Sequence, residues 1–189
     1  MLRGQRGVCF GPDRCYADGE GGNMDTVSET ISVRFLADFL NETLATERTL
    51  AALYRAALAR TADKTMRRHF ERFRTEAKGR ADVLCELIAK LHGEPGRPPA
   101  GTDLLLESMV AAMAAPVAAD FRQWKDLEVL LGAALICQRN WQILQAVGQD
   151  NGDPHIQKAV RQVIDEVDEQ VEHVRQAVLE RAPLAVLAG

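Results

Sequence analysis

Four long segments in which apolar residues recur with the 3.6-residue period of an α-helix constrain this chain most. The first runs to about residue 60, and the others span residues 64–92, 120–150 and 154–182. Each segment places its apolar side chains on one face, as amphipathic helices packed around a core do. Only 5% of the residues are aromatic, while alanine and leucine are abundant, which favours helices over sheets. The sequence therefore predicts an all-α protein.

Local signals mark where these helices begin and end. Asp63 follows a tight turn and is expected to cap the second helix, which Gly93 should stop. Asp120 is expected to cap the third helix, and the pair Asp153-Pro154 is a strong start for the fourth. We expect the fourth helix to end at Pro183, because proline interrupts helical hydrogen bonding.

The segment between the two helix pairs is long and of a different composition. It begins with Gly-Glu-Pro-Gly-Arg-Pro-Pro, which cannot be helical, and continues with an apolar stretch from Thr102 to Ala114. We expect a short helix there, ended by Pro116. A long connection lets the third helix restart at the far end of the molecule. Two antiparallel hairpins joined by such a crossover form the ferritin-like four-helix bundle.

The predicted domain organisation has three parts. Residues 1–24 are rich in glycine and charge without periodicity, and we expect a disordered N-terminal arm. Residues 25–182 form the bundle, and residues 183–189 form an apolar C-terminal tail. The tail is expected to pack on the bundle or on a dimer mate. It also resembles the short hydrophobic tails that dock ferritin-like cargo inside protein compartments.

Composition excludes several classes of partner. The formal net charge of −4 gives no global field that would attract nucleic acid. No run approaches the roughly 20 apolar residues of a membrane span, and the N-terminus lacks the apolar core of a signal peptide. Cys85 and Cys137 fall on or beside buried helix faces, as reduced thiols of cytoplasmic proteins do. We therefore expect a cytoplasmic protein without membrane or nucleic-acid partners.

Glu47 stands where the apolar face of the first helix should carry a leucine. Steps of about 100° per residue place it at the centre of the stripe that includes Leu40, Leu44, Ala51 and Tyr54. A lone buried carboxylate is costly, so Glu47 needs a cation, a hydrogen-bond network or a proton. This residue is the first candidate for a functional site.

The second helix carries a motif that resembles a known family. Residues 69–84 read HFERFRTEAKGRADVL and residues 91–95 read LHGEP. The run Thr75-Glu76-x-x-Gly79, with downstream leucines and a glycine before the crossover, resembles the YciF-type stress-response branch of the ferritin-like superfamily. The resemblance implies a dimer-forming, stress-associated bundle that binds iron at a di-iron site.

The ligand set of such a site is incomplete in this chain. A ferritin-like di-iron site needs one Glu from each of two helices and a Glu-x-x-His from each of the other two. Glu47 and Glu76 are the candidate metal ligands of the first hairpin, at about the same level of the bundle. Gly79 stands where the histidine belongs. On the second hairpin, Glu169 and His173 are expected on a solvated acidic face, away from the core.

Two further residues favour a structural network over a metal site. Arg80 lies near the core stripe, four residues after Glu76, and its permanently charged guanidinium could neutralise buried glutamates and repel a dication. Gln138 occupies the central polar position of the third helix, where a ligand Glu would stand. We therefore expect a buried polar network of Glu47, Glu76, Arg80 and Gln138.

Three functional hypotheses follow. The leading one is a homodimeric, non-catalytic stress-associated scaffold or interaction protein with a decayed di-iron site. The alternative is a di-iron protein that oxidises ferrous iron or handles iron, with Glu47 and Glu76 as ligands. The third is binding of an acidic partner through the basic outer face of residues 67–78, which would depend steeply on salt.

Overall fold

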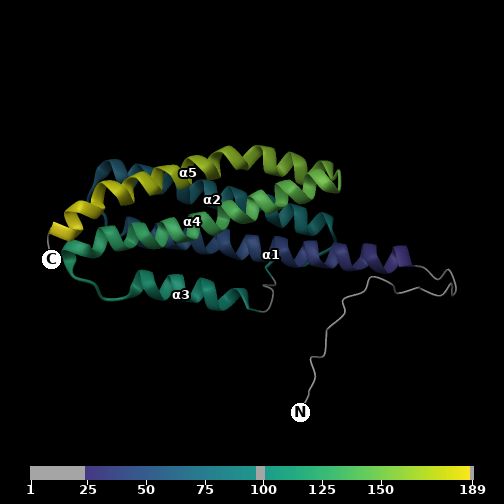
Figure 1. Cartoon of the computed structure of the whole chain (residues 1–189), viewed down its shortest axis with the longest axis horizontal. Helices are drawn as coiled ribbons and strands as arrows, with labels where there is room; N and C mark the ends of the chain where they lie inside the picture. Colours follow the sequence, from purple (N-terminus) through teal and green to yellow (C-terminus); the bar gives the residue numbers. More distant parts are fainter. Residues whose placement is uncertain (1–23, 97–100, 188–189) are drawn as a thin grey trace, which may run out of the picture.

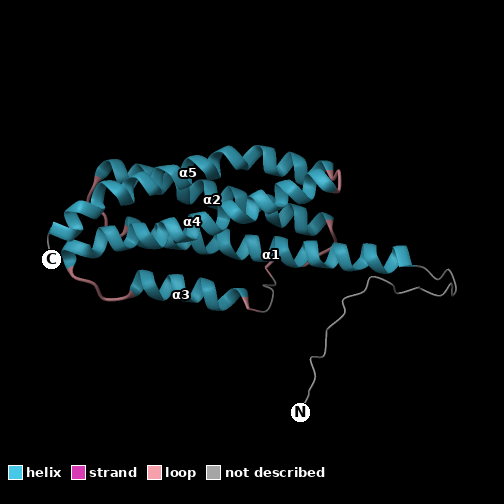
Figure 2. Ribbon diagram, viewed as in Figure 1, coloured by secondary structure: helices cyan, strands magenta, loops and turns pink. Residues whose placement is uncertain are grey.

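The computed structural model describes the backbone of residues 24–96 and 101–187, and all regular structure in these ranges is helical (Figures 1 and 2). Five helices follow one another along the chain. They are α1 (Met24–Leu58), α2 (Lys64–Lys90), α3 (Thr102–Ala114), α4 (Ala119–Asp150) and α5 (Pro154–Leu187). The prediction of an all-α bundle with a short helix over Thr102–Ala114 is confirmed.

The long helices pack as two hairpins, α1 with α2 and α4 with α5. The hairpins meet through α1 against α4 and α2 against α5, and each of these pairs is antiparallel (Figure 1). Helix α3 contacts α1 and α4, and runs back along the outside of the bundle. The crossover therefore spans the bundle and lets α4 begin beside the end of α1, where Arg60 and Asp126 form a salt bridge of 2.9 Å.

The core consists of two apolar clusters, one toward each end of the bundle. One contains Tyr54, Phe73 and Leu130, and the other contains Leu44, Leu84 and Trp141. On α1 the clusters are separated at Glu47, on α2 at Arg80, and on α5 at Gln170. All three of these polar side chains are no more than 1% exposed. The fold thus contains a dry polar layer at mid-height.

Two of the predicted helix caps are confirmed. Asp63 accepts hydrogen bonds from the backbone N–H groups of residues 65 and 66 at 2.9 and 3.1 Å. Asp153 does the same for residues 155 and 156 at 2.8 and 3.1 Å. Such caps satisfy donors that a helix start leaves free and typically contribute about 1 kcal/mol each.

The expected cap at Asp120 is wrong. Helix α4 begins one residue earlier, and Ala118 occupies the cap position without a side-chain hydrogen bond. In the first turn of α4, the guanidinium of Arg122 donates to the carbonyl oxygen of Ala115 at 2.8 Å and anchors the approaching chain.

The end of α2 is a Schellman motif with an unexpected residue in its left-handed position. The N–H of Gly93 donates to the carbonyl of Ile88 at 2.9 Å, and the N–H of His92 donates to Ala89 at 3.0 Å. His92 carries the positive φ of 55° that glycine normally takes. Gly93 is needed for a different reason, since a Cβ there would lie 2.9 Å from Cγ2 of Ile88.

The chain termini differ in part from the sequence-based boundaries. Helix α5 continues through Pro183 to Leu187, so the proline does not end it. Proline inside a helix removes one backbone donor and crowds the carbonyl of the residue four positions earlier, yet α5 continues for four residues beyond it. Most of the predicted N-terminal arm, residues 1–23, lies outside the described residues. Within those residues, no helix is long and apolar enough to cross a membrane.

Candidate functional site

Glu47 lies at the centre of the polar layer and is 0% exposed. Its carboxylate accepts three hydrogen bonds. Arg80 donates from Nε to Oε1 at 2.8 Å and from Nη2 to Oε2 at 3.0 Å. Trp141 donates from its indole nitrogen to Oε1 at 2.7 Å. Both carboxylate oxygens are therefore engaged, and a paired guanidinium balances the negative charge.

The network extends from Arg80 to the fourth long helix. Nη2 of Arg80 also donates to the side-chain oxygen of Gln170 at 2.8 Å, and the amide of Gln170 donates to the Tyr54 hydroxyl at 2.8 Å. Each of the four long helices thus contributes a polar side chain to this network, and α1 contributes Tyr54 as a second one. A continuous chain of hydrogen bonds links the layer across both hairpins.

One donor of Arg80 stays outside this chain of bonds. Its Nη1 is buried and has no hydrogen-bond partner among the described residues. The nearest acidic group is Glu166 on α5, whose Oε2 lies 3.9 Å from Nη1 and whose side chain is 46% exposed. The Nη1 group therefore faces the side of the bundle between α2 and α5, toward the partly exposed carboxylate of Glu166.

The surroundings hold neighbouring groups in their protonated forms. Burial raises the pKa of the Tyr54 phenol far above its ordinary value, and the hydrogen bond from Gln170 offsets only part of this. Burial, together with the charge of Glu47, also raises the pKa of the Cys137 thiol. Burial lowers the pKa of Arg80, but Glu47 more than reverses this effect and leaves it above its ordinary value. Neither a phenolate nor a thiolate nucleophile is available here at neutral pH.

The structure does not bring Glu76 into the network. Glu76 is 21% exposed on the flank of α2, and its Oε1 lies 3.4 Å from Nε of Arg72. Burial raises the pKa of its carboxyl, while Arg72 lowers it. Arg80, four residues later, turns to Glu47 instead. Position 79, where a ferritin-like site would carry histidine, is exposed, and a Cβ at Gly79 would meet nothing within 4 Å.

The expectation for Gln138 is wrong. Its side chain is half-buried at the edge of α4 and donates to Asp168 on α5 at 2.7 Å. The glutamine of the polar layer is Gln170, which the sequence analysis did not single out. Its position offered a signal, since it falls three residues after Val167 and four before Val174 on the core face of α5.

His173 is more enclosed than a solvated acidic face would make it. Its ring stacks on His69 of α2 with centroids 3.9 Å apart, and meets Phe73 edge-on at 5.4 Å. Glu169 remains on the surface, where it accepts from Arg72 at 2.6 Å. The two histidines thus pack between α2 and α5 rather than facing the polar layer.

No group of three or more His, Cys, Asp or Glu side chains that could hold a metal ion occurs in the part of the chain that the structure describes. Comparison of the chain with models of protein families, with curated proteins and with solved structures found no match. The class that fold and site define is an all-α helical bundle with a buried, charge-neutral polar layer.

Proposed function

We propose that this protein is a non-catalytic, ferritin-like scaffold or interaction protein in which an internal ion pair occupies the place of a di-iron site. The observation that carries the proposal is the double hydrogen bond from Arg80 to Glu47. The guanidinium lies on the carboxylate that a metal ion would need.

The arrangement of the helices supports the ferritin-like part of the proposal. Two antiparallel hairpins are joined by a crossover that runs the length of the bundle (Figure 1). Polar residues of both hairpins meet between the two apolar clusters. In ferritin-like di-iron proteins, ligands project inward from all four helices. Here the four inward positions hold one acid, one base and two neutral donors: Glu47, Arg80, Trp141 and Gln170.

The residues present do not fit a di-iron centre. Glu76 is turned to the flank, and the second hairpin brings Gln170 and Trp141 to the layer in place of carboxylates and histidines. Arg80 carries a permanent positive charge beside Glu47 and would repel a dication. Removing it from the carboxylate would leave both groups buried and unpaired, which costs several kcal/mol.

A structural role for the layer is consistent with its geometry. A buried carboxylate–guanidinium pair between two apolar clusters holds the helices in one register, because sliding α1 or α2 by one turn would strand a charge and sliding α4 or α5 would break a hydrogen bond to it. The apolar clusters provide the driving force for folding, and the layer selects one packing among the alternatives. The bundle then presents a stable outer surface.

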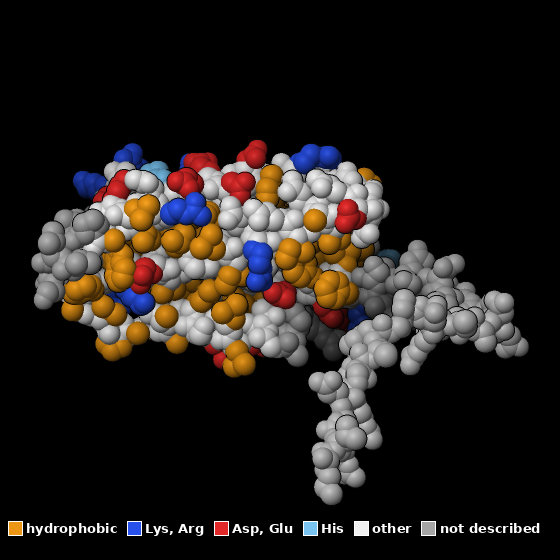
Figure 3. Space-filling view, in the orientation of Figure 1, with side chains coloured by type: hydrophobic (Ala, Val, Ile, Leu, Met, Phe, Trp, Pro, Cys, Tyr) orange, Lys and Arg blue, Asp and Glu red, His pale blue; other side chains and the backbone are white. Residues whose placement is uncertain are grey.

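That surface supports a role in association. Large apolar side chains are exposed on α1, α3 and α4, and Figure 3 shows such side chains gathered on the face formed by α3 and α4. The most exposed are Leu104 at 74% and Phe35 at 68%. Exposed apolar side chains that gather on one face, unlike ones scattered singly, are typical of protein–protein contact. We propose a homodimer in the cytoplasm, with a stress-associated role resting on the YciF-type motif alone.

Iron stoichiometry tests the proposal. The wild type and Glu47→Gln would be loaded with ferrous iron without oxygen, desalted and analysed for metal. We expect no retained iron above that of a metal-free bundle control in either protein. Retention of about two irons per chain by the wild type, lost in Glu47→Gln, would overturn the proposal and support the ferrous-oxidation alternative.

A further inference from the structure

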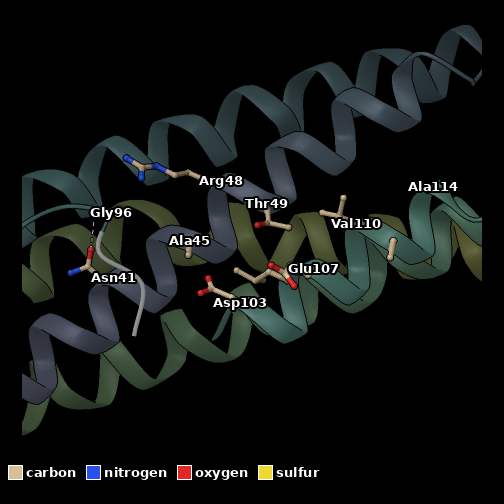
Figure 4. A pocket seen from close by; sticks show the side chains of 11 residues that line it. Asn41, Ala45, Arg48, Thr49, Gly96, Asp103, Glu107, Val110 and Ala114 are labelled. Carbon is tan, nitrogen blue, oxygen red and sulfur yellow. Dashed lines mark hydrogen bonds between the residues drawn. The ribbon is translucent and has the colours of Figure 1, made fainter. Parts of the chain in front are cut away.

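A groove of about 490 Å³ lies between α1 and the crossover helix α3, on the side of α1 away from α2 (Figure 4). It is hollow because small side chains face one another across it. Ala45 comes from α1, and Ala111 and Ala114 come from α3. Leu106 and Met113 anchor α3 and are 8% and 3% exposed. Alanines placed between these anchors cannot fill the space that leucines would fill.

The wall of the groove is apolar and open to solvent. Val110 lines it and remains 50% exposed, although valine is a residue that proteins normally bury. A ligand covering Val110 and the facing alanines would remove apolar surface from water, which favours binding. The volume lies within the roughly 300–1,000 Å³ of small-molecule sites in proteins.

Two of the three charged side chains that line the groove are acidic, and the third is Arg48. Asp103 and Glu107 lie one turn apart on α3, and both side chains lie between α3 and α1 (Figure 4). Among the described side chains, neither Asp103 nor Glu107 is paired in a salt bridge. A cation that enters between the helices would meet both carboxylates.

Of the other polar side chains at the groove, Asn41 is already hydrogen-bonded and Arg48 is turned toward α2, while Thr49 of α1 also lines it. The Asn41 side chain accepts from the N–H of Gly96 at 2.8 Å and donates to the carbonyl of Ala37 at 3.1 Å. The guanidinium of Arg48 lies well away from both carboxylates in Figure 4 and approaches Cys85 of α2, with Nη2 and Sγ 3.7 Å apart. A ligand head group would therefore meet two negative charges.

We propose that this groove binds a small amphipathic amine. Its aliphatic chain would cover Ala45, Val110 and Ala111, and its ammonium group would lie between Asp103 and Glu107. A primary alkylamine is protonated at neutral pH, since amines of this kind resemble the lysine side chain. The site shares no residue with the central polar layer and does not depend on the proposed scaffold role.

Calorimetric titration of the full-length protein with octylamine tests the site, with octanol and octanoate as ligands of the same chain length. We expect octylamine to bind about tenfold more tightly than octanol, which corresponds to about 1.4 kcal/mol, and octanoate to bind more weakly than either. Equal binding of octanoate and octylamine, or no binding of octylamine, would overturn the proposal.

Variants locate the binding to the groove. Asp103→Asn with Glu107→Gln should remove the preference for octylamine over octanol, and Ala45→Phe should fill the space and weaken both ligands. Asp82→Asn with Glu86→Gln is the matched control, since these acids are exposed on α2 at the same four-residue spacing. Unchanged octylamine affinity in the Asp103/Glu107 variant would overturn the site. Because those residues are exposed, this variant keeps the test decisive if Ala45→Phe fails to fold.

Discussion

Arg80 and Glu47 face each other across the α1–α2 hairpin as a two-bond ion pair whose side chains are 1% and 0% exposed. An ion pair this deeply buried stabilises the fold only while both partners are present. Each charge has lost its hydration, and the other charge and its hydrogen bonds replace that hydration. The stability of the bundle should therefore depend on the pair as a unit.

Arg80→Ala should lower the free energy of unfolding by about 3–5 kcal/mol, because it leaves Glu47 buried without its cation. Urea denaturation measures the change. Arg72→Ala is the control, since Arg72 lies on the same helix, pairs with Glu76 and Glu169, and is 43% exposed. Its loss should cost at most about 1 kcal/mol. Similar costs for the two variants would mean that Arg80 is not a buried charge partner.

The double change Glu47→Gln with Arg80→Met separates pairing from packing. It removes both charges while keeping much of the side-chain volume, so it should cost less than the sum of Glu47→Gln and Arg80→Met alone. The difference is the coupling energy of the pair. Additive costs would show that the two residues contribute independently.

Gln170→Ala should destabilise the bundle by about 1–3 kcal/mol, because it leaves the Tyr54 hydroxyl and one donor of Arg80 with fewer partners in a dry layer. Gln138→Ala is the matched control. Gln138 is half-buried and pairs with Asp168 at the surface, so its loss should cost about 0.5 kcal/mol or less. Chemical denaturation of both variants in the same buffer gives the comparison, and equal costs would contradict the assignment of Gln170 to the layer.

The contrast between these two glutamines shows what could be read from the sequence. The hydrophobic period located Glu47 because Leu44 lies three residues before it, Ala51 four residues after it and Tyr54 seven residues after it. The short helix Thr102–Ala114 and the caps at Asp63 and Asp153 followed from local chemistry, which acts over a few residues. Local signals of this kind need no knowledge of how the helices pack.

The partners of Glu47 required tertiary information. Glu76 and Gln138 are at the right level of the bundle, but the rotation of α2 and α4 about their axes turns them to the flanks. That rotation is set by side-chain packing between helices, which the sequence of one helix does not determine. Gln170 had the right phase on α5, yet a hydrogen-bonding partner for Arg80 could be recognised only once α2 and α5 were placed side by side.

His92→Gly should stabilise the protein by about 0.5–1 kcal/mol. His92 adopts φ of 55° at the end of α2, a conformation that costs a residue with a Cβ about 1–2 kcal/mol. Glycine avoids this cost, but part of the gain is lost because glycine increases the conformational entropy of the unfolded chain. Thermal denaturation should show a higher midpoint. Gly93→Ala should have the opposite sign, because the new Cβ would lie 2.9 Å from Cγ2 of the buried Ile88. A lower midpoint for His92→Gly would mean that the imidazole makes a compensating interaction.

The stacked histidines between α2 and α5 should make stability depend on pH. Burial lowers the pKa of His173 below its ordinary value of 6.5, and His69 and Arg72 lower it further, while Glu169 and Glu180 act in the opposite direction. The unfolded chain therefore binds a proton at a higher pH than the folded chain. The stabilising contribution is fully present above pH 6.5 and is lost as the pH falls through 6.5 toward the folded pKa.

The urea midpoint of the wild type should accordingly decrease when the pH is lowered from 7.5 to 5.5. The decrease should be smaller in His173→Gln, which has no imidazole to titrate. The comparison of the two proteins matters, because Glu76 contributes with the opposite sign: its pKa is raised by burial, so protonation on acidification favours its folded form. This contribution is common to both proteins and cancels in the difference. An equal fall in both would show that protonation of His173 does not couple to the packing of α2 on α5.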